Sequence, residues 1–308
     1  MRKLLVTGGA GFIGSNLVLF LQERFPDDEI VVVDDFRSGA FENLRGFNGD
    51  FIAADAARLD WQRQFGDTAF DAIFHEASIT DTTEADQRLQ AHDNIEGFRR
   101  VLEFAAPRHT PVVYASSAAV YGTGGGVMTE DQARAPANIY AFSKVQLENL
   151  AAWHRRRAPS WRIVGLRYFN VYGPREAHKG AAASMIYQLY RQMKSGERPR
   201  IFRTSEQQRD FVYVTDVVRL TAQALTAGKS PVYNCGTGQS CSFNEVIGEL
   251  NRCLGTRLEP EYFDNPYPFY QAHTEANMTL AKNELSYSVS YGPREGIADY
   301  VATLERGQ

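Results

Sequence analysis

The amino-acid sequence predicts an α/β fold with a doubly wound parallel sheet and a smaller, discontinuous second domain. Short apolar runs alternate with helical patterns through the first half, and a glycine-rich turn follows the first run. The 308 residues suit two domains, or one large α/β unit with an elaboration. A hydrophobic fraction of 44% and a charged fraction of 23% are typical of globular chains. This composition excludes disordered, collagen-like and coiled-coil proteins.

Six strands are predicted in the first half, separated by helical patterns. The strands are residues 3–7, 29–34, 51–54, 72–75, 112–115 and 163–167. The clearest helical patterns are residues 15–25, 94–106 and 141–157. Strands that alternate with helices form βαβ units, whose parallel sheet is covered by helices on both faces.

After Tyr168 the alternation weakens. A helix is expected at 182–195, strands at 211–214 and 232–235, and a last helix at 296–304. We therefore assign residues 1–169 plus about 211–241 to a dinucleotide-binding domain. Residues from about 170–210 plus 242–308 form most of a substrate domain, and the last helix could return to the first domain.

Charge and cysteine content narrow the partners and the compartment. The net charge of −4 shows no basic excess for nucleic acid or an anionic membrane. The apolar run 30–33 is far shorter than the about 20 residues that span a bilayer. Three cysteines are too few for a disulfide framework and lack metal-ligand spacing. A cytoplasmic protein without a metal is expected.

The glycine-rich turn has the features of a dinucleotide site. Gly8, Gly11 and Gly14 lie between a predicted strand and a predicted helix. Turns without side chains let the backbone approach a pyrophosphate, and the helix N-terminus supplies free N–H groups. Asp34, twenty residues past Gly14, ends the second strand, where a carboxylate can bind a ribose hydroxyl. The sheet is therefore predicted to be of the Rossmann type.

The residues after Asp34 leave the choice between NAD and NADP open. Carboxylates at Asp34 and Asp35 favour a free 2′-hydroxyl and repel a 2′-phosphate. Arg37 could offset that repulsion by pairing with the phosphate.

A tyrosine, a lysine and a serine form a candidate catalytic set. Tyr140 and Lys144 are four residues apart, so on a helix they share a face. A free phenol has a pKa of about 10, and a nearby ammonium would lower it toward the working range. Ser116 and Ser117 end the fifth strand, at the edge where such sheets bind ligands. A Ser117 hydroxyl there can hydrogen-bond the reacting oxygen.

These motifs resemble the extended short-chain dehydrogenase/reductases that act on nucleotide sugars. Residues 74–77, 166–180, 209–213 and 270–274 further resemble the ADP-L-glycero-D-manno-heptose 6-epimerases of lipopolysaccharide-precursor synthesis. The resemblance implies inversion at C6 of ADP-D-glycero-D-manno-heptose, through a 6-keto intermediate that a bound nicotinamide re-reduces. It also implies NADP, with NAD as the alternative, and a homo-oligomer such as a pentamer.

Lys179 is given a role by the chemistry of such an inversion. Hydride must return to the opposite face of a planar ketone, and C6 lies outside the ring, so rotation about an exocyclic bond suffices. The oxygen then faces another side of the pocket, where a second acid/base group is useful. The resemblance assigns that role to Lys179, beside Tyr140. The alternative is that Lys179 neutralises a phosphate or caps the next helix.

The resemblance also implies two sets of binding residues. The cofactor set is Gly8, Gly11, Phe12, Ile13, Gly14, Asp34, Asp35, Arg37, Glu76, Ala77, Ser78, Ile79, Thr80, Asn94, Tyr140, Lys144, Val171 and Lys179. The substrate set is Ser117, Asn170, Ala181, Ser184, Gln188, Phe202, Arg203, Thr204, Ser205, Arg209 and Tyr270. Arg209 is the best phosphate partner, because a guanidinium can bind phosphate bidentately. Ala181 and Gln188 stand where the family often has Ser and His, and Asp35 where it often has Asn.

Several other functions compete with this interpretation. A UDP-hexose 4-epimerase would share the loop and the Ser/Tyr/Lys set but would not need Lys179. A 4,6-dehydratase is disfavoured, because Ala118 and Ala119 after Ser117 supply no carboxylate. A net dehydrogenase would change nicotinamide absorbance stoichiometrically. A non-enzymatic nucleotide sensor would not need the intact Ser/Tyr/Lys set.

Overall fold

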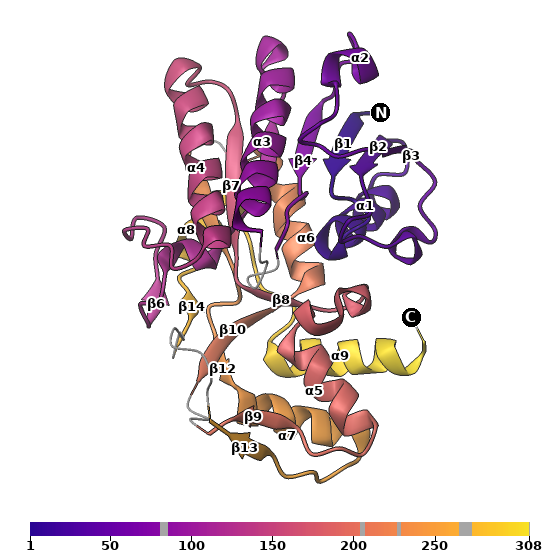
Figure 1. Cartoon of the computed structure of the whole chain (residues 1–308), viewed down its shortest axis with the longest axis vertical. Coiled ribbons are helices and arrows are strands. Elements are labelled where there is room, and N and C mark those ends of the chain that lie inside the picture. The colour runs from indigo at the N-terminus through magenta and orange to yellow at the C-terminus, as the bar shows by residue number, and fades with distance from the viewer. Residues whose placement is uncertain (81–85, 204–206, 227–228, 265–272, 308) are drawn as a thin grey trace.

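A computed structural model describes residues 1–80, 86–203, 207–226, 229–264 and 273–307. Its main sheet has seven parallel strands in the order β11-β7-β5-β4-β1-β2-β3 (Figure 1). The strands are β1 (Lys3–Thr7), β2 (Glu29–Asp34), β3 (Asp50–Ala53), β4 (Ala72–His75), β5 (Val112–Ser117), β7 (Ile163–Tyr168) and β11 (Val232–Cys235). The chain winds outward from β1 to β3 and then restarts at β4 on the other side of β1. The predicted doubly wound Rossmann-type sheet is confirmed.

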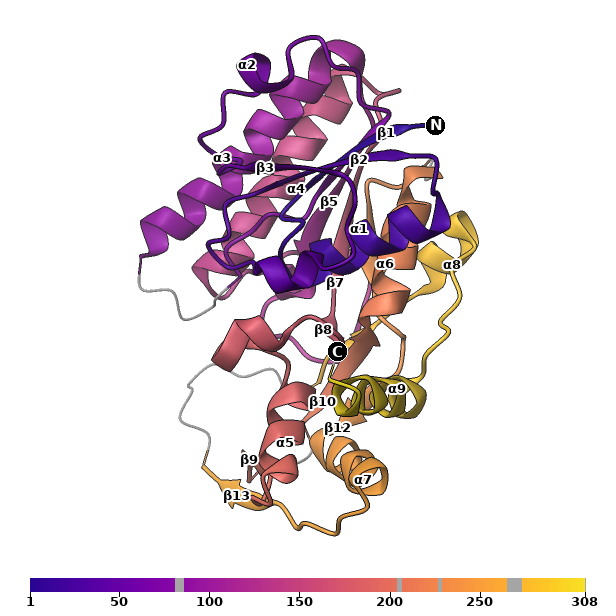
Figure 2. The same ribbon diagram turned by 90° about the vertical axis from the view of Figure 1, so that its right-hand side faces the viewer.

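Helices cover both faces of this sheet, as Figure 2 shows. One face packs against α1 (Phe12–Arg24), α6 (Val214–Gln223) and α8 (Thr279–Leu285). The other packs against α2 (Trp61–Phe65), α3 (Gln87–Ala105) and α4 (Ile139–Arg157). Strand side chains alternate between faces, so the core on the α1 side contains Leu4 and Val6 while Leu5 belongs to the opposite core. Because both faces of the sheet are buried, the sequences of its strands are continuous apolar runs.

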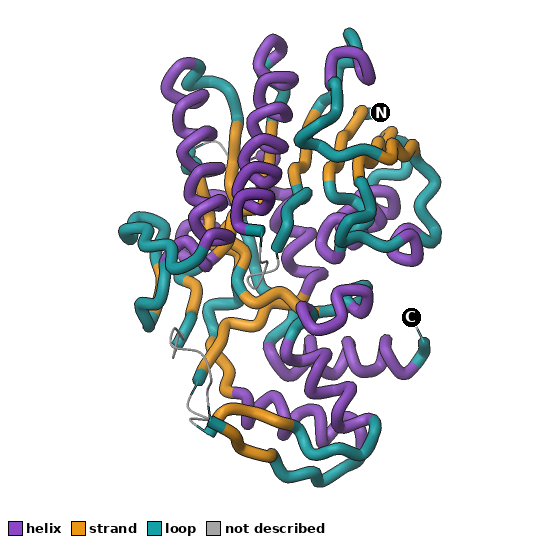
Figure 3. Tube along the Cα trace, in the orientation of Figure 1, coloured by secondary structure: helices purple, strands orange, loops and turns teal. Residues whose placement is uncertain are grey.

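A second group of elements lies beyond the carboxyl ends of the sheet strands (Figures 1 and 3). It contains a three-stranded sheet of β8 (Asn170–Tyr172), β10 (Gln208–Tyr213) and β12 (Ser240–Ser242), and the pair β9 (Arg200–Phe202) and β13 (Glu261–Phe263). Helices α5 (Met185–Lys194), α7 (Phe243–Leu254) and α9 (Pro293–Glu305) pack there around a separate core. A small pair, β6 (Val127–Met128) and β14 (Glu275–Ala276), lies next to β10 through β14.

Most predicted elements are found, with shifted ends. The strand expected at 211–214 begins earlier, as β10, and α6 starts directly after it. Helices α2, α6, α7 and α8 were not predicted. The last helix, α9, packs on α7 and β10, while α8 packs on β11. The division of the chain into two domains stays a prediction. No helix in the described part of the chain combines the length and apolar character needed to cross a membrane.

Candidate active site

A cleft of about 860 Å³ opens at the carboxyl ends of the sheet strands, between the sheet and the second group of elements. All four predicted catalytic residues and all predicted cofactor-binding residues line it. From the predicted substrate set, Ser117, Asn170, Ser184 and Arg209 line it as well. Among the described residues of that set, Ala181, Gln188, Phe202 and Arg203 do not. Thr204, Ser205 and Tyr270 lie outside the described residues.

The glycine turn leaves no room for side chains. Gly8 has a φ of +73°, and a Cβ on it would lie 2.5 Å from the Ala77 amide nitrogen. A Cβ on Gly14 would lie 2.1 Å from the Gly8 carbonyl oxygen. Helix α1 begins at Phe12 on the cleft wall, where its first N–H groups have no partner within the helix. This arrangement suits a pyrophosphate.

Buried polar atoms on the cleft wall also suit a bound dinucleotide. Ser78 Oγ, His75 Nε2 and His178 Nε2 are buried and have no hydrogen-bond partner among the residues that the structure describes. Buried polar groups are normally paired, so orphaned atoms around a cleft point to a missing partner. Together with the glycine turn, they show that the residues present fit a nicotinamide dinucleotide.

The predicted catalytic set comes together at the start of α4. The Asn138 side chain accepts a hydrogen bond from the Ala141 N–H at 2.8 Å, which places Tyr140 in the first turn. Ser117, at the end of β5, lines the cleft together with Tyr140. Burial raises the pKa of the Tyr140 phenol, and the nearby Ser117 hydroxyl opposes that effect.

Lys144 lies on the inner side of Tyr140. Its Nζ donates to the Ala115 carbonyl oxygen at 2.9 Å and lies 5.7 Å from the centre of the Tyr140 ring. Burial lowers the pKa of Lys144 to about 8, although the Glu76 carboxylate acts in the opposite direction. Lys144 therefore lies next to Tyr140, and its pKa is near the working pH.

His75, the last residue of β4, and Glu76, which follows it, complete this end of the cleft. Tyr168 donates to Glu76 Oε1 at 3.0 Å, and burial raises the pKa of Glu76 to about 7. His75 bonds Thr7 Oγ1 at 2.8 Å, and burial lowers its pKa to about 3. His75 is therefore neutral at physiological pH, so the titrating groups here are Glu76 and Lys144.

Lys179 reaches the cleft from the 3-10 helix η4 (Ala177–Ala182), with Nζ 5.7 Å from the centre of the Phe12 ring. Burial lowers its pKa. The segment before it is tied to the glycine-turn side. Arg175 bonds the Asn43 carbonyl and the Asn16 side chain, each at 3.2 Å, and His178 Nδ1 lies 3.0 Å from Asn43 Nδ2. Lys179 therefore stands beside the start of α1.

Glu176 organises the other side of that segment. Its carboxylate accepts from the Gly173 N–H at 3.1 Å, the Ser184 N–H at 2.5 Å and the Ser184 hydroxyl at 2.8 Å. Ser184 Oγ also accepts from the Tyr187 N–H and caps α5. The Ser184 side chain, predicted to bind substrate, is thus engaged in holding this segment.

The remaining predicted substrate residues are scattered. Gln188 bonds the carbonyls of Ala181 and Ala183 at 2.8 and 3.0 Å. The Phe202 ring packs on Phe263. Arg203 is exposed and pairs with Asp264 at 3.0 Å. Of the two arginines in the predicted substrate set, Arg203 and Arg209, the structure places Arg209 on the cleft wall, where it is largely buried.

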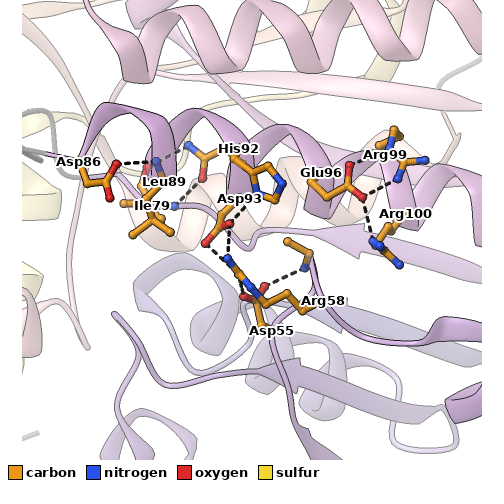
Figure 4. Close-up of polar contacts among 12 residues, drawn as sticks. Asp55, Arg58, Ile79, Asp86, Leu89, His92, Asp93, Glu96, Arg99 and Arg100 are labelled. Carbon is orange, nitrogen blue, oxygen red and sulfur yellow. Dashed lines mark hydrogen bonds and ion pairs between the residues drawn. The ribbon is translucent and has the colours of Figure 1, made fainter.

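Sequence reasoning missed a carboxylate cluster at the other end of the cleft. Asp55 and Asp93 line the cleft beside Asp34, Asp35 and Arg37. Asp55 follows the end of β3, and Asp93 precedes Asn94, which was predicted to contact cofactor. The position of Asp55 at a carboxyl strand end was the available signal. Figure 4 shows Asp55 and Asp93 with Arg58 between them.

Comparisons with a family model and with solved structures point to the same class of protein. A model of the NAD dependent epimerase/dehydratase family matches residues 4–236. The ADP-L-glycero-D-manno-heptose-6-epimerase of Helicobacter pylori is 39% identical, with a TM-score of 0.91 over 99% of this chain and 96% of that one. The UDP-glucose 4-epimerase of Thermotoga maritima, solved with UDP-glucose, is 29% identical, with a TM-score of 0.92 over 99% of both chains.

A third structure contains a nicotinamide cofactor. The UDP-glucuronic acid 4-epimerase of Bacillus cereus, in complex with UDP-glucuronic acid and NAD, is 28% identical to this chain. Its TM-score is 0.85, over 98% of this chain and 99% of that one. The three relatives share the fold along nearly their whole length and differ in the sugar nucleotide that they act on.

Proposed function

The chain belongs to the NAD-dependent epimerase/dehydratase family, and we propose that it inverts C6 of ADP-D-glycero-D-manno-heptose. It is a nucleotide-sugar epimerase of the extended short-chain dehydrogenase/reductase superfamily. The observation that carries the choice of C6 is the presence of Lys179 in the same cleft as Tyr140, Lys144 and Ser117. The 39% identity to the Helicobacter pylori heptose epimerase supports it.

The first half-reaction oxidises C6. When bound, a nicotinamide dinucleotide supplies the acceptor and later the donor of hydride. Tyr140, as phenolate, takes the proton of the 6-hydroxyl while hydride leaves C6, which leaves a 6-ketone. Ser117 donates a hydrogen bond to the reacting oxygen, and the Lys144 ammonium, 5.7 Å from the centre of the Tyr140 ring, would favour the negative charge of the phenolate.

The second half-reaction returns hydride to the opposite face. Rotation about the exocyclic bond at C6 turns the ketone and moves its oxygen to another side of the cleft. Lys179 then donates a proton to that oxygen as hydride returns, which yields the epimeric alcohol. Proton exchange with solvent restores the Lys179 ammonium and the Tyr140 phenolate. Burial lowers the pKa of Lys179, so its ammonium releases a proton more readily than an exposed one.

A UDP-hexose 4-epimerase is the second candidate. The Thermotoga maritima UDP-glucose 4-epimerase matches the fold with a TM-score of 0.92. In that reaction the whole sugar turns in the site, and Lys179 would serve as a phosphate contact. Its place beside Phe12 at the start of α1 is compatible with that role.

An NMR assay separates these candidates. Purified protein is incubated with ADP-D-glycero-D-manno-heptose and no added cofactor, and we expect the C6 epimer to appear. Parallel incubations with UDP-glucose and UDP-N-acetylglucosamine should show no 4-epimer. Conversion of a UDP-hexose without conversion of the heptose would replace the proposal with the second candidate.

The resemblance further implies a homo-oligomer that serves lipopolysaccharide-precursor synthesis. Light scattering coupled to gel filtration measures the mass of the assembly directly. A pentamer is the expected result, and a mass corresponding to a monomer or a dimer would contradict it.

A further inference from the structure

The end of the cleft near β2 is rich in carboxylates. Asp34, Asp35, Asp55 and Asp93 all line it, together with Arg37. Asp34 ends β2, where such folds bind the adenosine ribose. Its carboxylate accepts from the Ala10 N–H at 2.9 Å and the Phe36 N–H at 2.8 Å, so it is fixed in place. A ribose would therefore meet a preformed acidic surface.

Arg37 is the cation that sequence reasoning offered to a 2′-phosphate, but its guanidinium is already occupied. Nη1 lies 2.5 Å from Asp93 Oδ2. Nη2 lies 3.0 Å from Asp55 Oδ2 and 3.2 Å from Asp35 Oδ2. Three carboxylates thus bind one guanidinium. To reach a phosphate, Arg37 would have to leave all three.

Asp93 is the firmest of these partners, because it is itself held in place. Arg58 Nη2 and Nη1 lie 3.0 and 3.1 Å from its two oxygens, and His92 Nδ1 lies 3.0 Å from Oδ1 (Figure 4). The Asp93 side chain is only 5% exposed. Although burial opposes ionisation, its bonds to Arg58, His92 and Arg37 lower the pKa of Asp93 to about 2. It remains an anion at every physiological pH.

The charges of this cluster do not favour a phosphate. Four carboxylates face two guanidinium groups, Arg37 and Arg58, so the acidic groups of the cluster outnumber its guanidinium groups by two. A 2′-phosphate brings further negative charge close to Asp34 and Asp35 and would be repelled. A 2′-hydroxyl can instead donate a hydrogen bond to a carboxylate.

We propose that Asp93, by holding Arg37 in ion pairs with the acidic cluster, makes this protein bind NAD in preference to NADP. The inference rests on the proposed function to the extent that the cleft holds a nicotinamide dinucleotide. It reverses the NADP expected from the sequence resemblance. Asp93 acts through Arg37 and is a positioning residue for cofactor choice.

Binding affinity, rather than turnover, tests this inference. Protein stripped of nucleotide is titrated calorimetrically with NAD and separately with NADP. We expect NAD to bind at least about tenfold more tightly, which corresponds to about 1.4 kcal/mol. The nucleotide that co-purifies with the protein, identified by mass spectrometry after denaturation, should be NAD(H). Equal affinities, or tighter binding of NADP, would overturn the inference.

Asp93→Asn tests the part played by Asp93. Loss of this carboxylate frees one side of Arg37 and makes the cluster less negative, so the preference for NAD should fall several-fold. In the double variant Asp93→Asn/Arg37→Ala that gain in NADP binding should disappear. An unchanged ratio of the two dissociation constants in Asp93→Asn would contradict the inference. If this variant fails to fold, Asp55→Asn should shift the ratio in the same direction by a smaller factor.

Glu96→Gln is the matched control. Glu96 lies one turn further along α3 and pairs with Arg99 and Arg100, outside the lining of the cleft (Figure 4). Its substitution should leave the ratio unchanged, and an equal shift would show that Asp93 has no specific effect. Protein that shows the NAD preference but leaves ADP-heptose unchanged would refute the proposed function alone. Absence of binding for both dinucleotides would refute both proposals.

Discussion

The two ends of the cleft handle charge in opposite ways. At the end near β2, Asp93 is paired with two arginines and its pKa is lowered to about 2. At the end near α4, Lys144 and Glu76 have few direct partners, and burial brings their pKa values to about 8 and about 7. Paired charges stay fixed over a wide pH range, whereas desolvated ones titrate near neutrality. The end near β2 therefore suits recognition of a ligand by groups whose charge does not change with pH. The end near α4 suits proton transfer.

Tyr140→Phe should have the largest effect on catalysis, and it acts at the end of the cleft near α4. It removes the proposed proton acceptor and leaves the end near β2 intact, so kcat should fall about 10³- to 10⁴-fold while NAD still binds. Steady-state kinetics and calorimetry measure the two quantities. Tyr262→Phe is the control, because its hydroxyl lies 3.3 Å from Asn244 on α7, away from the cleft. Near-normal turnover in Tyr140→Phe would refute the assigned role.

Lys179→Met should lower kcat by about 10²-fold, the lower end of the usual effect of an acid/base group. The methionine keeps the side-chain length and removes the proton. A loss of NAD affinity with little change in kcat would instead identify Lys179 as a phosphate contact. Lys194→Met is the control, since Lys194 pairs with Glu305 on the protein surface. The ratio of forward to reverse kcat shows whether one direction of proton transfer is affected more.

Glu176→Gln tests the segment that carries His178 and Lys179, both of which line the cleft. The amide can no longer accept all three bonds from Gly173 and Ser184. We expect the free energy of unfolding to fall by about 1–3 kcal/mol. Thermal unfolding of the stripped protein measures this loss. Unchanged stability would mean that the segment is held by its bonds to Asn16 and Asn43 alone.

The sequence predicted the main sheet because its strands carry local signals. Strands β1, β2, β4 and β11 are apolar runs bounded by turn residues or charged residues, and their ends agree with the prediction. Helix α7 was missed although Ser242 and Glu245 form a capping box that the sequence displays. The pair of β9 and β13 joins segments about sixty residues apart, and its pairing has no local signature.

The candidate site likewise contains residues that the sequence predicted and contacts that it did not predict. Motif residues such as Gly8 and Tyr140 were found because their spacing carries the signal, and they line one cleft. The pairing of Arg37 with Asp93 joins residues 56 positions apart, so Arg37 looked available to a phosphate. The bonds of Ser184 to Glu176 likewise depend on how the segment folds back. The spacing of residues in the sequence identifies candidate functional side chains. Tertiary contacts decide which of these side chains can bind a ligand.

Glu76→Gln should have the smallest effect. It should change only the ionisation of the groups near α4. The Glu76 carboxylate raises the pKa of Lys144 against the effect of burial. Without that charge, the ammonium loses its proton at lower pH, and the phenolate of Tyr140 loses its support there. The alkaline limb of the kcat profile should therefore move to lower pH by roughly half a unit to one unit.

Profiles of kcat between pH 5 and 10 measure this shift, with Glu103→Gln as a surface control, since Glu103 pairs with Arg99 on the outside of α3. Glu76→Gln should keep the preference for NAD over NADP, because the paired charges near β2 stay ionised. A shift of the alkaline limb to higher pH would show that Glu76 acts on Tyr140 by direct repulsion of the phenolate, more strongly than through Lys144. A changed preference between NAD and NADP in Glu76→Gln would show that the two ends of the cleft are electrostatically coupled.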